Sequence, residues 1–215
     1  PALLEWLSAD FLSHGWSVKR LIRQLMTSTV YRQTSRVQNE GSTSPDSHSR
    51  DPRSADPSNR LLWQMPLRRL ESEVIRDSVL ATSGCLDFTI GGPPTNVEAR
   101  NDGTVVVPEN ETATAKWRRS VYLLMRRSYH VNLMSVFDQP VMATNYSKRD
   151  ASAVPLQSLT MLNDPFMLQQ SRAFAERVSR LAGPSADRQI LIAYQLSLSR
   201  EPEADERTWC REMID

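Results

Sequence analysis

Apolar residues recur every three or four positions along most of this chain, so amphipathic helices dominate its predicted structure. The clearest example is residues 18–33, whose apolar positions are Val18, Leu21, Ile22, Leu25 and Met26. This spacing places the side chains on one face of a helix, and Ser17 before them is a suitable N-cap. The sequence therefore predicts a mainly α fold.

Further helices are predicted for residues 2–14, 67–83, 155–162, 165–181, 187–199 and 203–215. Gly15 and Gly84 are placed as C-terminal stops, and Pro165 takes the first helical position after the N-cap Asp164. Because the first two helices follow each other closely, we expect them to form a helical hairpin.

A short β-ribbon is the exception to this helical pattern. Turn residues around Asn101-Asp102-Gly103 precede a β-branched run at residues 105–107, which predicts a strand. Its expected partner is residues 120–125, although so short an apolar run fits a buried helix equally well. The predicted fold class is thus a multi-helix domain with a small two-stranded β-ribbon near residues 104–126.

Residues 35–59 divide the chain, because they are rich in Ser, Asp, Arg, Pro and Gly and have almost no apolar anchor. They are predicted to be a loop or disordered insert. The expected organisation is one domain, with an N-terminal hairpin at residues 1–34 and a main helical part with the β-ribbon at residues 60–215. The chain starts at Pro1 and stops within a helical pattern, so we expect a domain truncated at both ends.

Charge and composition limit the classes of function. A net charge of +1 argues against a nucleic-acid-coating protein, and no apolar run reaches the roughly 20 residues of a membrane span. Of the 26 basic residues, 23 are Arg. Arg suits bidentate binding of carboxylate, sulfate or phosphate, but a GC-rich genome would give the same bias.

Cysteine and histidine usage gives no sign of a cofactor or a metal within this segment. Cys85 and Cys210 form either one bridge or two buried thiols, and no Cys-x-x-Cys-His run for covalent haem occurs. His14, His48 and His130 lack metal-ligand spacing.

The predicted helix at residues 67–83 has the densest charge pattern. If it is helical throughout, Arg69 and Arg76 pair with Glu73 on an exposed side. Asp77 lies beside the apolar stripe of Leu67, Leu70, Val74 and Ala81, so it should meet an Arg from elsewhere, with Arg119 and Arg126 as candidates. The candidate polar cluster comprises Arg69, Glu71, Glu73, Arg76, Asp77, Arg119, Arg126 and Asp138.

This cluster has two interpretations, and neither assigns a catalytic residue. It is an internal salt-bridge network that fixes the helix to the ribbon, or a polar cleft for acid-base chemistry on a sugar. The Arg pairs at residues 118–119 and 126–127 likewise form either an anion clamp or the solvated ends of a buried strand. Four tryptophans are expected in the core, with a sugar-stacking platform as the alternative: Trp6, Trp16, Trp63 and Trp117.

Five strings resemble one known family, in the family's order: residues 59–63, 68–77, 119–123, 137–140 and 156–166. Together they are similar to the C-terminal domain of unknown function of large planctomycete cell-envelope proteins. The resemblance implies export to the periplasm or cell surface, other domains of the parent chain as partners, and haem c in an upstream cytochrome module.

The expected function is a non-catalytic accessory or interaction module of a multidomain exported protein linked to such a cytochrome c module. One alternative is an enzyme or enzyme subunit that acts on an anionic polysaccharide, sulfated or uronic. Another is a docking surface for an electron-transfer partner, such as a cytochrome, through Arg119, Arg126 and Arg127.

Overall fold

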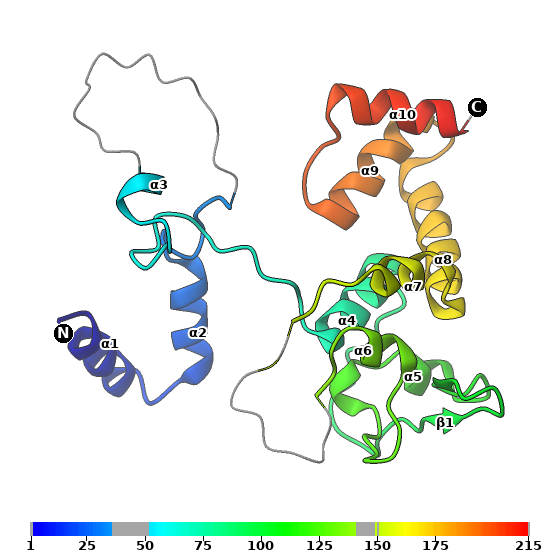
Figure 1. The fold of residues 1–215 in the computed structure, drawn as a ribbon, viewed down its shortest axis with the longest axis horizontal. Coiled ribbons are helices and arrows are strands. Elements are labelled where there is room, and N and C mark those ends of the chain that lie inside the picture. Colours follow the sequence, from blue (N-terminus) through cyan, green and yellow to red (C-terminus); the bar gives the residue numbers. More distant parts are fainter. Residues whose placement is uncertain (1, 36–51, 141–148, 150, 215) are drawn as a thin grey trace. The chain divides into compact units, whose positions relative to one another are not determined.

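The computed structural model describes residues 2–35, 52–140, 149 and 151–214, and the mainly α class with a small β-ribbon is confirmed (Figure 1). The chain divides into two compact units, an N-terminal unit of residues 1–68 and a C-terminal unit of residues 69–215. Residues 60–68, which the sequence pattern grouped with the main helical part, therefore lie with the N-terminal helices. The expectation of a single domain overall stays a prediction.

The N-terminal unit contains the predicted helices α1 (Ala2–Ser13) and α2 (Val18–Thr27). The Ser17 hydroxyl caps α2 by accepting a hydrogen bond from the backbone N–H of Arg20 at 3.3 Å. The helix ends at Thr27, before the predicted end at residue 33. The Ser28 hydroxyl donates to the Leu25 carbonyl at 2.7 Å, a local bond that competes with continuation of the helix.

Most of the expected insert, residues 36–51, lies outside the described residues. Its described end forms a helical turn, α3 (Pro52–Ala55), followed by a turn centred on Asp56. The Asp56 carboxylate accepts from the Leu61 N–H at 2.7 Å, and the Trp63 indole donates to the Asp56 carbonyl at 3.0 Å. This end of the insert therefore has defined structure.

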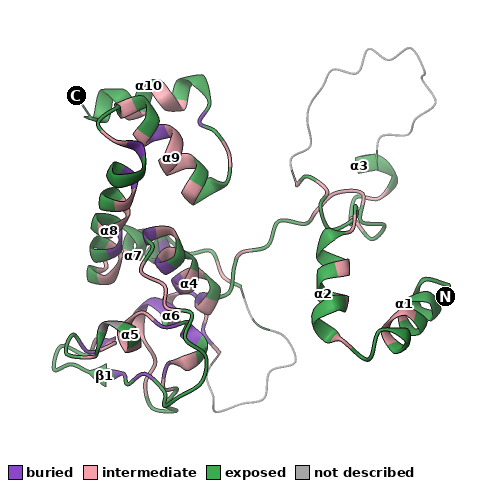
Figure 2. Cartoon of the chain, turned by 180° about the vertical axis from the view of Figure 1, so that it is seen from behind, coloured by how far each residue is buried: buried purple, intermediate pink, exposed green. Residues whose placement is uncertain are grey.

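Among its described residues, the N-terminal unit has no buried side chain, and Figure 2 accordingly shows no purple in α1 or α2. Half or more of the surface of Trp16 and Ile22 is exposed, at 66% and 50%. The apolar faces of α1 and α2 are thus not buried by the described residues of this unit.

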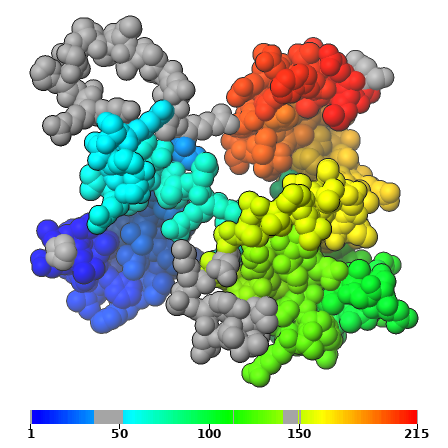
Figure 3. All heavy atoms as spheres, in the orientation of Figure 1, coloured from blue at the N-terminus to red at the C-terminus, as the bar shows by residue number. Residues whose placement is uncertain are grey.

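The C-terminal unit is built around α4 (Ser72–Ser83), which contacts α6 (Asn132–Val136), α8 (Pro165–Ala182) and the 3₁₀ helix η1 (Ser120–Tyr122). The remaining helices are α5 (Ala113–Lys116), α7 (Pro155–Asn163), α9 (Ala186–Leu198) and α10 (Ala204–Ile214). Helices α9 and α10, orange and red in Figure 3, pack together beyond α8. None of the helices described here has both the length and the apolar character for crossing a bilayer.

Two helix boundaries follow their sequence signals. The Asp164 carboxylate caps α8 by accepting from the Phe166 N–H at 2.8 Å, with Pro165 at the first position. Gly84 ends α4 with a φ of 85°, a conformation in which glycine has no steric penalty.

The β-ribbon pairs β1 (Glu98–Ala99) with β2 (Val105–Val106), antiparallel, so the predicted partner at residues 120–125 is wrong. Part of that segment is the 3₁₀ helix, and next to it Leu124 N–H donates to the Thr95 carbonyl at 2.8 Å. The turn at residues 101–103 closes a hairpin locally, and this short closure outcompetes pairing with a more distant strand.

Helix α4 begins at Ser72 rather than near residue 67, and it buries a different face from the predicted one. The buried residues are Ser72, Arg76, Leu80 and Ser83, whereas Leu67, Leu70 and Val74 are exposed. A mixed polar face is therefore turned inward, and its hydrogen bonds define the candidate site.

Candidate functional site

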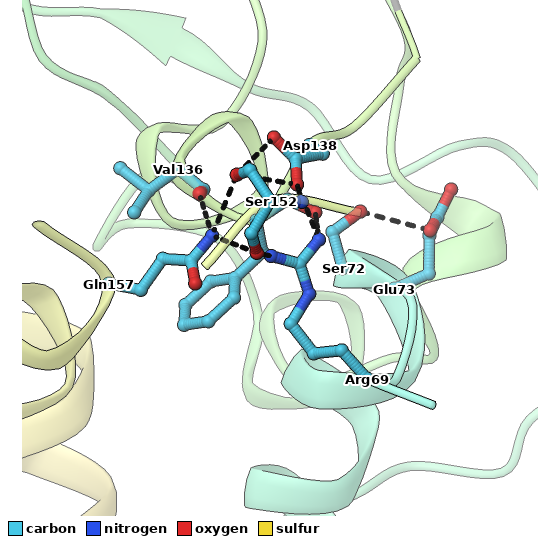
Figure 4. Close-up of polar contacts among 8 residues, drawn as sticks. Arg69, Ser72, Glu73, Val136, Asp138, Ser152 and Gln157 are labelled. Carbon is cyan, nitrogen blue, oxygen red and sulfur yellow. Dashed lines mark hydrogen bonds and ion pairs between the residues drawn. The ribbon is translucent and has the colours of Figure 1, made fainter. Parts of the chain in front are cut away.

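Arg69 does not form the predicted helical pair with Glu73, because it precedes α4. Its guanidinium instead reaches Asp138, with Nη2 2.5 Å from Oδ2, and also donates to the Ser152 carbonyl (Figure 4). It lies 5.8 Å from the centre of the Phe137 ring. Arg69 thus connects the start of α4 to two segments that are far away in sequence.

Asp138 completes this connection, which we call the Arg69 clamp (Arg69, Asp138, Ser152 and Gln157). The backbone N–H of Ser152 donates to Asp138 Oδ2 at 2.7 Å, and Gln157 donates to the carbonyls of Val136 and Ser152 at 3.1 and 3.2 Å. The Ser152 N–H and the Arg69 guanidinium hold the pKa of Asp138 below its ordinary value. The carboxylate is therefore ionised and occupied by its own chain.

Glu73 and Glu71 share one cation that the sequence analysis did not single out. Arg149 Nη1 lies 2.6 Å from the Glu73 carboxylate and 3.2 Å from that of Glu71. Partial burial raises the pKa of Glu73, but the hydrogen bonds from Arg149 and Ser72 outweigh it and the net pKa is lowered. No sequence signal marks Arg149, because it lies outside the predicted helices and strands and 76 residues after Glu73.

Arg76 was expected on an exposed side, yet only 2% of it is exposed. Nη1 donates to the Arg118 carbonyl at 2.9 Å and to the Ser120 hydroxyl at 3.3 Å, and Nη2 donates to the Lys116 carbonyl at 3.1 Å. Burial lowers the pKa of Arg76 to about 10, so the side chain stays charged at neutral pH. The prediction of a surface pair with Glu73 is wrong because these carbonyls hold Arg76 in the interior.

Asp77 contacts the segment around η1, which supplies the hydrogen bonds and the positive charge that a partly buried carboxylate needs. It accepts hydrogen bonds from both the backbone N–H and the hydroxyl of Ser120 at 2.7 Å. Arg119 and Arg76 each lie 3.9 Å from its oxygens. Arg126, the other candidate partner, lies over the ring of Tyr129 at 5.6 Å.

The eight predicted residues therefore do not form one site. Arg76, Asp77 and Arg119 meet beside η1; Arg69 and Asp138 form the clamp; Glu71 and Glu73 share Arg149; and Arg126 stacks on Tyr129. Each carboxylate in these groups is bound by an Arg of the same chain. The internal salt-bridge interpretation accounts for this arrangement better than a common polar cleft does.

The C-terminal unit also has a pocket of about 550 Å³, which no sequence pattern predicted. It opens between β2, α6 and the first turns of α8, with the rings of Trp117 and Phe166 6.3 Å apart in its wall. Of the predicted cluster only Arg76 lines it. Two sequence signals could have indicated it: the adjacent pair Lys116-Trp117, and Phe166 in the first turn of a helix that Asp164 caps.

The described part of the chain has neither a metal-binding group of side chains nor a disulfide. No group of three His, Cys, Asp or Glu side chains there is placed to hold a metal ion. Cys85 and Cys210, for which a bridge or two thiols remained open, are both free thiols.

Comparison with known proteins gives a family without an activity. Residues 1–214 match the sequence profile of PSD1, a family described as a protein of unknown function, DUF1553. No curated protein and no solved structure matches the chain. The domain of unknown function expected from the five strings agrees with this result at that general level. Because the match covers nearly every residue, the chain belongs to the PSD1 (DUF1553) family.

Proposed function

We propose that this chain is a non-catalytic interaction module of a larger exported protein, and that its N-terminal unit docks on another domain of the same polypeptide. The observation that carries this proposal is the lack of any buried residue among the described residues of that unit. Helices of this length are marginal in water unless tertiary packing covers their apolar face.

Helix α2 supplies the best-defined part of the docking face. Val18, Ile22, Leu25 and Met26 are all exposed and lie at helical spacing on one side. Lys19 and Arg23 occupy other positions of the same helix, and Arg20 contacts Asp10 at 3.1 Å. An amphipathic helix with such a stripe suits an apolar groove on its partner.

The state of the carboxylates supports a non-catalytic role. A general acid at neutral pH needs a raised pKa, but the pKa values of Glu73 and Asp138 are lowered by their Arg and Ser partners. Glu71, Glu73, Asp77 and Asp138 also do not line the 550 Å³ pocket. The alternative of an enzyme on anionic polysaccharide therefore loses the residues on which it rested.

The location and the neighbours are proposed from the family resemblance. We place the module in the periplasm or at the cell surface, with haem c in an upstream domain rather than in this chain. A cytochrome that docks through exposed cations remains an alternative partner. Arg119, Arg126 and Arg127 are all exposed and available to it, and such docking would weaken strongly with salt.

The test is titration calorimetry of the 215-residue chain against the remaining domains of its parent protein, produced separately. Ile22→Gln with Leu25→Gln removes two apolar side chains from the docking face while keeping good helix formers. Lys19→Gln with Arg23→Gln is the matched control on the other faces of α2. We expect the first pair to weaken binding by more than about tenfold, because each buried Ile or Leu contributes about 1.5–3 kcal/mol.

The control pair should change the affinity by less than about threefold, as exposed charges contribute little. Equal affinities for the chain and the Ile22→Gln, Leu25→Gln variant would refute the docking face. A lower melting temperature of the 215-residue chain alone, with unchanged affinity, would show that the face is covered within the chain and would also refute it.

A further inference from the structure

The pocket between β2, α6 and α8 has cationic side chains that are not paired with a carboxylate in the described parts of the chain. Each of its three carboxylates has a partner in the chain: Asp102 accepts from Thr104 at 2.9 Å, Glu109 meets Arg100 at 3.4 Å, and Asp164 caps α8. Two of its cations, Lys116 and Arg172, have no carboxylate partner among the described residues. The pocket therefore has positive charge to offer to a ligand.

Lys116 is held where a ligand can meet it. Its ammonium lies 4.7 Å from the centre of the Trp117 ring, so a cation–π contact rather than an ion pair fixes its position. Trp117 and Phe166 give the wall two apolar rings, which are tilted by 45° to each other. A ring that packs against this wall would bring an attached anionic group within reach of Lys116.

Beside apolar side chains such as Val105, Val131 and Leu133, the lining has polar side chains that suit the hydroxyl groups of a ligand. Asn132 Oδ1 accepts from the Val105 N–H at 2.9 Å, which leaves its amide NH₂ as a donor. Gln169 also lines the pocket, and its amide has no hydrogen-bond partner within the described parts of the chain. Asp102 and Glu109 keep spare lone pairs for hydroxyl donors.

We propose that this pocket binds an acidic sugar, a pyranose ring that carries a carboxylate. The ring packs on Trp117 and Phe166, the carboxylate meets Lys116 and Arg172, and the hydroxyls bond to Asn132, Gln169 and the carboxylate edges. The volume of about 550 Å³ is ordinary for a small-ligand site. This site is independent of the apolar face on α2, so either proposal can fail without the other.

The experiment is an NMR titration of the 215-residue chain with trigalacturonate, the corresponding neutral galactose trisaccharide and benzoate. We expect saturable shifts centred on the amides of Trp117, Phe166 and Gln169 with trigalacturonate, and at least about tenfold weaker binding of the other two. Benzoate tests whether a flat ring and a carboxylate suffice without hydroxyls.

The variant Arg172→Gln removes one pocket cation, and Arg180→Gln is its control, an exposed Arg two turns further along α8 that does not line the pocket. We expect Arg172→Gln to weaken trigalacturonate binding about fivefold and Arg180→Gln to leave it unchanged. Equal binding of the neutral sugar, tighter binding of benzoate, no saturable shifts, or equal effects of the two variants would each overturn the proposal. Unchanged circular dichroism spectra establish that both variants fold.

Discussion

The two units have helices of similar length, yet among the described residues only the C-terminal unit has buried side chains. In the C-terminal unit α4 buries Leu80 completely and holds Arg76 against carbonyls of a distant segment, whereas no described residue of α1 or α2 is buried (Figure 2). Helix periodicity is present in both units. The difference shows that an amphipathic pattern predicts a helix but does not say what covers it.

The interior of the C-terminal unit is also unusually polar. Ser83 on α4 donates to the Gln170 side chain on α8 at 2.7 Å, and both residues are buried. Arg76 joins the same helix to the backbone before η1. Hydrogen bonds therefore fix which helices meet, while Leu80, Leu133 and Met134 supply the apolar contacts.

Of the substitutions considered, Arg76→Met should reduce the stability of the C-terminal unit most. It removes three hydrogen bonds and leaves the carbonyls of Lys116 and Arg118 buried without a donor. We expect a loss of about 4 kcal/mol in the free energy of unfolding, measured by urea denaturation. Arg180→Met, an exposed control on α8, should cost less than about 0.5 kcal/mol. A cost for Arg76→Met as small as the control's would mean that the buried Arg does not organise the unit.

A pair of equivalent truncations compares the two units directly. Leu80→Ala in α4 should cost about 3 kcal/mol, since it leaves a cavity at a side chain with no exposed surface. Ile22→Ala in α2 should cost less than about 0.5 kcal/mol in the 215-residue chain, because Ile22 is half exposed. Calorimetric melting measures both, and similar costs for the two variants would contradict the contrast between the units.

Asp138→Asn should have a smaller, pH-dependent effect. Asp138 has a φ of 58°, which Asn tolerates, so the substitution removes mainly the charge that meets Arg69. Because the folded pKa lies below the unfolded value of 3.8, the unfolded chain takes up this proton first as the pH falls. The stabilisation is complete above the unfolded pKa and is lost as the pH falls through the folded pKa.

We therefore expect Asp138→Asn to cost about 1 kcal/mol at pH 7, with the difference from the unsubstituted chain disappearing as the pH falls through the folded pKa of Asp138. Urea denaturation at a series of pH values measures this difference. A cost that is the same at pH 7 and pH 2.5 would show that the charge of Asp138 contributes nothing.

Local signals predicted much of the fold, since they act within a few residues. Ser17, Gly84 and the Asp164-Pro165 pair each bound the helix that they were expected to bound. The start of α4 was misplaced because Arg69 is drawn out of the helical pattern by Asp138, 69 residues away. A contact over that separation cannot be predicted from the residues near Arg69.

The candidate site was less predictable, for the same reason. The charge spacing on α4 suggested that Glu73 pairs with Arg69 and Arg76, but a carboxylate pairs with whichever cation the tertiary structure brings near, here Arg149. The pocket depends on Trp117, Phe166 and Arg172, which come from two segments about 50 residues apart along the chain. Their proximity follows from packing of α8 rather than from any pattern within either segment.

Native-state hydrogen exchange of the intact 215-residue chain is the most direct test of the account, because it reports both units in one sample. We predict that the amides of α4 and α8 exchange only through global unfolding, and that those of α1 and α2 exchange through local opening that costs less than about 2 kcal/mol. Protection of α2 equal to that of α8 would contradict the claim that the described helices of the N-terminal unit have no core and need a partner to cover them.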